Sequence, residues 1–180
     1  MPLPPSPKAL PEVTIRPARL SDCPDILAIY NDAVLNTTAS YDYEPRSLAH
    51  REEWWAAHQR DGMAVLVAET PTGEIVGWSA LNKYHDRVGY RFTTENSIYV
   101  ASTWRGRGVG GLLLPPLIEA ARNRGLHAII ACIDAQNEVS IRLHERFGFQ
   151  RVGLFRRVGY KFGRWLDVAY LELLVEPAPC

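Results

Sequence analysis

The stretch that most constrains the fold is "STWRGRGVGG" at residues 102–111, which joins an apolar alternating segment to a helical pattern. The preceding "NSIYV" (96–100) is typical of a strand, and the following apolar run is helical to about Asn123, with Gly125 to end it. A glycine-rich turn that opens a helix exposes backbone N–H groups beside the positive end of the helix dipole. The stretch therefore indicates a strand–turn–helix unit that binds an anion, although a surface turn that uses glycine for positive φ remains an alternative.

Two phosphate-binding motifs can be traced through this turn. Gly106, Gly108 and Gly111 spell G-x-G-x-x-G, the dinucleotide fingerprint, whereas Arg105, Gly108 and Gly110 spell R-x-x-G-x-G. A nucleotide P-loop is excluded because no Gly-Lys-Ser/Thr is present.

The surrounding sequence favours the second motif. In a dinucleotide fold the first glycine follows its strand almost at once, but here residues 101–105 intervene, and only one clear strand–helix unit follows the turn. Arg105 and Arg107 add positive charge suited to a ligand that carries several phosphates, such as coenzyme A.

The remaining elements alternate irregularly between strands and helices. We expect helices from Ser21, over 47–60, from the glycine turn and over about 137–148, and strands near 13–18, 64–69, 74–81, 96–100, 127–133, 150–160 and 167–175. This order predicts an α/β (α+β) fold with a mixed sheet and helices on its faces. Because a proline removes a backbone hydrogen bond, Pro115-Pro116 predicts a kink near residues 111–116.

Length and charge limit the class of protein. The 180 residues suit a single domain over 12–176, between a flexible Pro-rich tail at 1–11 and a short tail at 177–180. Twenty basic residues balance 20 acidic ones, so the surface offers no general attraction to nucleic acid or to an anionic membrane. Three widely spaced cysteines, no signal peptide and no apolar run of membrane-spanning length predict a cytoplasmic location.

Five segments in order resemble the GNAT acetyltransferases, and within them the phosphinothricin and methionine sulfone/sulfoximine N-acetyltransferase group. The segments are "IYNDAVLNT", "YRFTTENSIYV", "RGRGVGGLLL", "NEVSIRLHERFGF" and "GYKFGRWLDVAYLEL". The resemblance covers residues 13–175 and implies a GNAT fold with a central sheet of about seven strands. It also implies direct transfer of acetyl from acetyl-CoA to the amine of a small amino-acid-like substrate.

The resemblance assigns the cofactor contacts. Backbone groups of a strand are expected to pair with the pantetheine arm, the glycine turn to hold the pyrophosphate, and a polar stripe on a later helix to face the cofactor. In this chain they are Ile98, Tyr99 and Val100; Arg105, Gly106, Arg107, Gly108, Val109, Gly110 and Gly111; and Asn137, Ser140 and His144.

Two residues are expected to move protons. Glu95, in the T-x-E-x-S-x-Y-V segment just before "NSIYV", is the expected base, because an α-amino group is mostly protonated at neutral pH and must lose a proton before it attacks. His144 stands where many GNAT enzymes carry a tyrosine that protonates the departing thiolate. It is expected to be a general acid, an accessory proton relay or a structural residue.

The acceptor contacts are less constrained by the sequence. Arg91 is expected to clamp a substrate carboxylate while Glu95 meets the amine. Tyr30 could wall the pocket, as could Trp78 and Tyr84, although core packing is the commoner role of such residues. Lys161 and Trp165 lie on a hairpin that in the resembled group reaches the partner's substrate region, which implies a homodimer.

Other functions remain open at this point. No histidines show metal-ligand spacing, so we expect no metal. An acetyltransferase for protein N-termini or polyamines, a non-catalytic CoA-binding regulator and a nicotinamide-binding protein are the alternatives.

Overall fold

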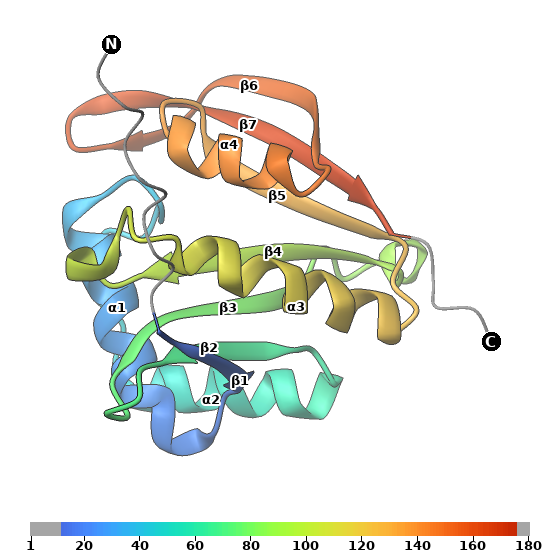
Figure 1. Cartoon of the computed structure of the whole chain (residues 1–180). Coiled ribbons are helices and arrows are strands. Elements are labelled where there is room, and N and C mark those ends of the chain that lie inside the picture. The colour runs from blue at the N-terminus through green and yellow to red at the C-terminus, as the bar shows by residue number, and fades with distance from the viewer. Residues whose placement is uncertain (1–11, 176–180) are drawn as a thin grey trace, which may run out of the picture.

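The computed structural model describes residues 12–175, which form a seven-stranded mixed sheet covered by helices on both faces (Figure 1). The predicted tails at 1–11 and 177–180 lie outside the described residues. The strands are β1 (Thr14–Pro17), β2 (Val65–Glu69), β3 (Ile75–Lys83), β4 (Thr93–Val100), β5 (Ala128–Asp134), β6 (Gln150–Lys161) and β7 (Arg164–Leu174). Their spatial order is β1-β2-β3-β4-β5-β7-β6, and every neighbouring pair is antiparallel except β4 and β5. The predicted mixed sheet is confirmed.

Four α-helices bury two separate cores against this sheet. They are α1 (Cys23–Asn36), α2 (Leu48–Asp61), α3 (Val109–Asn123) and α4 (Glu138–Arg146). Ile26 and Ile29 of α1 pack with Trp78 on one face, where α2 lies beside α1, whereas Leu113 of α3 and Ile141 of α4 belong to the larger core on the other face (Figure 1). Burial of both cores fixes the sheet between two helical layers.

Local capping explains where the helices on the α1/α2 face begin. Ser47 caps α2 by accepting the N–H of His50 (3.2 Å), and Gly62 ends it in the left-handed region (φ 61°). The prediction of Ser21 as the N-cap of the first helix is wrong, because Asp22 holds that position. Ser21 lies in a short 3₁₀ turn, and α1 begins after Asp22, whose carboxylate accepts the N–H of Arg19 and two N–H groups of Arg16.

The strand that carries the expected base is longer than predicted. β4 begins at Thr93 rather than at Asn96, so Glu95 lies within the sheet and not just before a strand. It is opposite Asn82 on β3 and Ile130 on β5. The additional pairing on both sides holds the backbone of Glu95 in place.

The two prolines of α3 do not end the helix. α3 continues through Pro115 and Pro116 to Asn123, and its first turn is intact, as predicted. The predicted kink remains a prediction.

Among residues 12–175, no helix has the length and apolar character needed to cross a bilayer.

Candidate active site

The site is centred on the place where the two parallel strands separate. β4 and β5 are paired only at Thr93, Thr94 and Glu95, although β4 continues to Val100 and β5 to Asp134. Beyond Glu95, β5 is paired only with β7. The sheet therefore opens next to the expected base, and one edge of β4 is left free.

The free edge carries backbone groups of Ile98 and Val100. The N–H of Ala101 donates to Val76 on β3, and the carbonyl of Phe92 accepts from residues at the start of β5, so even-numbered residues of β4 direct their peptide groups toward β5. Tyr99 has the opposite parity and is paired with Trp78 of β3. This pairing does not support the predicted backbone contact of Tyr99 with the cofactor. Within the described chain, Ile98 offers free peptide groups and Val100 a free N–H, since the Val100 carbonyl accepts from Arg105.

The glycine turn presents a row of free N–H donors at the start of α3. Gly106 (φ 71°) and Gly108 (φ 94°) adopt left-handed conformations that other residues rarely take. Within the described chain, the peptide N–H groups of residues 106–110 donate to no protein acceptor. Convergent backbone donors at a helix N-terminus form an anion site.

Close packing behind the turn accounts for its third glycine. A Cβ at Gly110 would lie 3.0 Å from Cδ2 of Leu143 on α4, so glycine allows α3 and α4 to approach each other. The turn and the free edge of β4 thus fit the pyrophosphate and the pantetheine arm of acetyl-CoA, respectively.

The two arginines of the turn differ in their contacts. Arg105 is fastened to the protein, because its Nε donates to the carbonyl of Val100 (3.1 Å) and its Nη2 pairs with Asp32 of α1 (3.0 Å). Arg107 is exposed and lies over the ring of Trp104. Arg105 joins the turn to α1, whereas Arg107 keeps its charge accessible to a ligand.

Glu95 is half-buried and has a raised pKa. Loss of water is the main cause, and the Cys132 thiol of β5 partly opposes it by stabilising the carboxylate. The same burial and the charge of Glu95 raise the pKa of Cys132 to about 12. Glu95 is thus a stronger base than an exposed glutamate, as a general base for an amine requires.

His144 is buried on the α3/α4 side with both ring nitrogens occupied. Nδ1 lies 2.8 Å from the carbonyl of Ser140, and Nε2 lies 2.8 Å from the Asn96 amide nitrogen. Its burial lowers its pKa. The polar stripe predicted on α4 makes contacts within its own helix, because the Asn137 side chain caps α4 by accepting the N–H of Ser140 (3.1 Å).

A pocket of about 240 Å³ lies on the α1/α2 face of the sheet. It is lined by Tyr30, Asp42, Arg46, His50, Arg51, Trp54, Trp78, Asn82, Ser97 and Tyr99. The amide nitrogen of Asn82 donates to the carbonyl of Glu95 (3.2 Å) and to Oγ of Ser97 (3.0 Å). The pocket therefore adjoins the strand segment where β4 and β5 separate.

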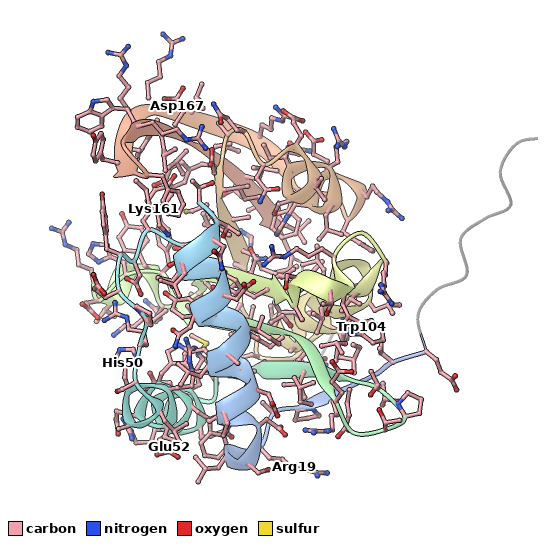
Figure 2. The ribbon with its side chains drawn as sticks, turned by 90° about the vertical axis from the view of Figure 1, so that its left-hand side faces the viewer. Arg19, His50, Glu52, Trp104, Lys161 and Asp167 are labelled. Carbon is pink, nitrogen blue, oxygen red and sulfur yellow. The ribbon has the colours of Figure 1, made fainter. Side chains whose placement is uncertain are left out.

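Three predicted acceptor contacts lie in different places. Tyr30 lines the pocket, and its hydroxyl donates to Asp42 (2.7 Å). Arg91 is exposed, is stacked on Phe92 and does not line the pocket. Lys161 is 2% exposed and donates to the carbonyls of Thr37 (3.0 Å) and Ser40 (2.6 Å), and in Figure 2 it lies near the end of α1. In its own chain Lys161 is a structural contact, and its contact with a partner's acceptor remains a prediction.

Sequence reasoning missed Arg51, which is the most buried charged residue of the pocket at 3% exposure. Its guanidinium lies over the rings of Tyr30, Trp54 and Trp78. A signal was present, because Arg51, Trp54 and His58 are spaced as neighbours on one helix face, which puts a charge on an aromatic stripe. Among residues 12–175, no three His, Cys, Asp or Glu side chains gather as metal ligands would.

Comparison with known proteins agrees with this geometry. The acetyltransferase (GNAT) family model matches residues 26–149. An L-methionine sulfoximine/L-methionine sulfone acetyltransferase of Pseudomonas paraeruginosa is 46% identical over 91% of this chain and 95% of its own length.

Solved structures are similar over the same region. A ribosomal-protein-alanine N-acetyltransferase of Brucella melitensis is 44% identical with a TM-score of 0.88, over 90% of this chain and 99% of that one. A GNAT superfamily phosphinothricin acetyltransferase of Sinorhizobium meliloti, solved in complex with acetyl-CoA, is 34% identical with a TM-score of 0.89, over 91% and 89% of the two chains.

Proposed function

Because the chain belongs to the GNAT acetyltransferase family and is an acetyl-CoA-dependent N-acetyltransferase, we propose that its acceptor is the α-amine of a small amino acid. Methionine sulfone, methionine sulfoximine and phosphinothricin define the class. The observation that carries this proposal is a small pocket, lined by aromatic and charged side chains, beside the opening between β4 and β5. Its volume of about 240 Å³ suits a ligand of the size of an amino acid.

The cofactor side of the site uses backbone groups more than side chains. The free N–H groups of residues 106–110 would hold the pyrophosphate, with Arg107 adding charge. The free edge of Ile98 and Val100 would hold the pantetheine arm as an added strand. The N–H of Ile98 is the free donor nearer to Glu95, so we assign it to the thioester carbonyl as oxyanion-type stabilisation.

Glu95 acts on the acceptor. It takes a proton from the substrate ammonium, and the neutral amine then attacks the thioester carbon. The new C–N bond forms as the C–S bond breaks, and the second proton of the attacking nitrogen passes to the departing thiolate of CoA. Because Glu95 is half-buried and its pKa is raised, it is a stronger base for the ammonium proton than an exposed glutamate.

His144 is better suited to positioning than to donating a proton. A neutral imidazole whose Nδ1–H is donated to Ser140 carries no proton on Nε2, where Asn96 approaches. We therefore assign His144 to holding Asn96, the neighbour of Glu95, at the point where β4 leaves β5.

A protein N-terminus is the second candidate acceptor, because of the 44% identity to a ribosomal-protein-alanine N-acetyltransferase. The two candidates are separated by measuring acetyl-CoA consumption with methionine sulfone, methionine sulfoximine, phosphinothricin and alanine-initiated peptides. We expect turnover with the amino acids and at least tenfold lower kcat/KM with the peptides. The reverse order would contradict the proposal.

A homodimer is also proposed, from the apolar outer surface of the β6–β7 hairpin. Its large exposed side chains include Val152, Leu154, Phe155, Val158, Tyr160, Phe162 and Trp165. So many large apolar side chains exposed on one hairpin favour a protein interface. Light scattering of the wild type should give twice the chain mass of 20.3 kDa, and Trp165→Asp should shift it toward the monomer. A monomeric wild type would contradict the proposal.

The cytoplasmic location is proposed on the wide spacing of the cysteines alone.

A further inference from the structure

Arg51 is buried in the pocket without an anionic partner among residues 12–175. Its side chain takes part in no ion pair or hydrogen bond within the described chain, and its Nε is fully enclosed. Its enclosed Nε has lost hydration that no hydrogen bond replaces, which disfavours its burial. A ligand with an anionic hydrogen-bond acceptor would pair with the Arg51 guanidinium.

The contacts that Arg51 does make leave its N–H donors free. The guanidinium carbon lies 4.6 Å from the ring centre of Tyr30, 4.5 Å from that of Trp54 and 5.3 Å from that of Trp78. Cation–π contacts stabilise the charge but satisfy none of the five N–H groups. The rings thus hold a planar fork of donors that matches a carboxylate.

The other charges of the pocket are already paired. Asp42 forms two hydrogen bonds with Arg46, at 2.7 and 2.8 Å, and accepts a third from the hydroxyl of Tyr30. Asp42 is therefore engaged by Arg46, and Arg51 carries the uncompensated charge.

We propose that Arg51 binds the carboxylate of the acceptor amino acid, an inference that rests on the proposed acetyl transfer. Arg51 lies over Trp78, the strand neighbour of Tyr99, while Ser97 occupies the next position toward Glu95 on the same face. Residues two apart on a strand are about 7 Å from each other. Tyr99 and Glu95 are four residues apart, about 13 Å along the strand, and Glu95 does not line the pocket. A carboxylate at Arg51 therefore places the α-amine on the Ser97 side of the pocket, and its proton reaches Glu95 through water. In this proposal Arg51, rather than Arg91, binds the substrate carboxylate.

The test compares two substrates that differ only in the carboxylate, L-methionine sulfone and its decarboxylated amine, 3-(methylsulfonyl)propylamine. The ratio of their kcat/KM values is measured in wild type, Arg51→Gln and Arg51→Lys. Taking the change in ratio between enzymes cancels the different intrinsic reactivity of the two amines. We expect Arg51→Gln to lower the preference for the amino acid about 10- to 100-fold, the range of a charged hydrogen-bond pair, and to change turnover of the amine less than about threefold. Arg51→Lys should keep part of the preference, because it retains the charge without the fork.

Two further variants complete the design. Arg60→Gln is the matched control, because Arg60 lies on the same helix, is exposed and pairs with Glu53, and it should keep the wild-type ratio. Arg91→Gln tests the other arginine. An unchanged ratio of the two kcat/KM values in Arg51→Gln would overturn the inference. So would a large fall of this ratio in Arg91→Gln alone.

Thermal unfolding separates a ligand-binding arginine from a structural one. Arg51→Met removes the isolated charge and keeps the apolar stem, so its Tm should be equal to or above that of the wild type. A Tm several degrees lower, together with an unchanged ratio, would overturn the inference.

Failure of the proposed function would look different. If the wild type acetylated neither amine, the proposed acceptor class would be wrong, and calorimetry with methionine sulfone and its carboxamide would then decide the role of Arg51. At least tenfold tighter binding of the acid, lost in Arg51→Gln, supports the inference, and equal binding of the two compounds overturns it.

Discussion

The amide nitrogen of Asn96 on β4 lies 2.8 Å from Nε2 of His144 on α4, and this contact joins the strand that opens the sheet to the helix behind it. The other ring nitrogen, Nδ1, lies 2.8 Å from the Ser140 carbonyl, and burial lowers the pKa of the imidazole, which favours its neutral form. The contact thus joins β4 to α4.

The positioning role of His144 predicts a moderate loss on substitution. We expect His144→Phe to lower kcat less than about tenfold and to leave the alkaline side of the pH–rate profile unchanged. A residue that protonates the thiolate would give a loss nearer 10²- to 10⁴-fold and would remove the alkaline limb. Steady-state rates between pH 6 and pH 10 distinguish these outcomes.

Cys132 is predicted to tune the base, because its thiol acts on the pKa of the Glu95 carboxyl. The thiol lowers the pKa of a carboxyl that burial has raised, so Cys132→Ala should raise that pKa further. Activity depends on ionised Glu95, and the acid limb of kcat/KM should therefore move to higher pH in Cys132→Ala. Cys132→Ser, with a stronger donor, should move it to lower pH. Identical acid limbs in all three proteins would show that the thiol does not act on Glu95.

The glycine turn is predicted to be specific for acetyl-CoA binding. Gly108 has φ 94°, so Gly108→Ala strains the turn by about 1–2 kcal/mol and disturbs its row of N–H donors. We expect the KM for acetyl-CoA to rise at least fivefold. Gly73→Ala is the matched control, because Gly73 has φ 86° in the distant β2–β3 turn and no atom within 4 Å of an added Cβ. It should lose similar stability and keep the wild-type KM. Equal KM values for acetyl-CoA in Gly108→Ala and Gly73→Ala would show that the glycine turn does not bind acetyl-CoA.

The backbone architecture could be predicted from local patterns. Ser47, Gly62 and Gly125 mark helix ends through capping and positive φ, which depend on a few neighbouring residues. The missed start of α1 has a tertiary cause, since Asp22 is held by Arg16 of β1, and only the folded chain brings those two residues together.

The glycine turn at the start of α3 was predictable because its motif is contiguous in sequence. The acceptor side was not, since Arg51 meets Trp78 and Tyr30 only after α2 packs on the sheet. The direction of the Tyr99 peptide groups, which face β3, likewise depends on the register between β3 and β4.

The central claim is that Glu95, at the opening between β4 and β5, takes the proton from the acceptor amine. Its most direct test is single-turnover acetyl transfer to methionine sulfone by wild type and Glu95→Gln at saturating acetyl-CoA, with the affinity for acetyl-CoA measured in parallel. We predict a 10²- to 10⁴-fold slower transfer in Glu95→Gln at neutral pH, with the Kd for acetyl-CoA changed less than about twofold. Transfer at the wild-type rate by Glu95→Gln would contradict the account.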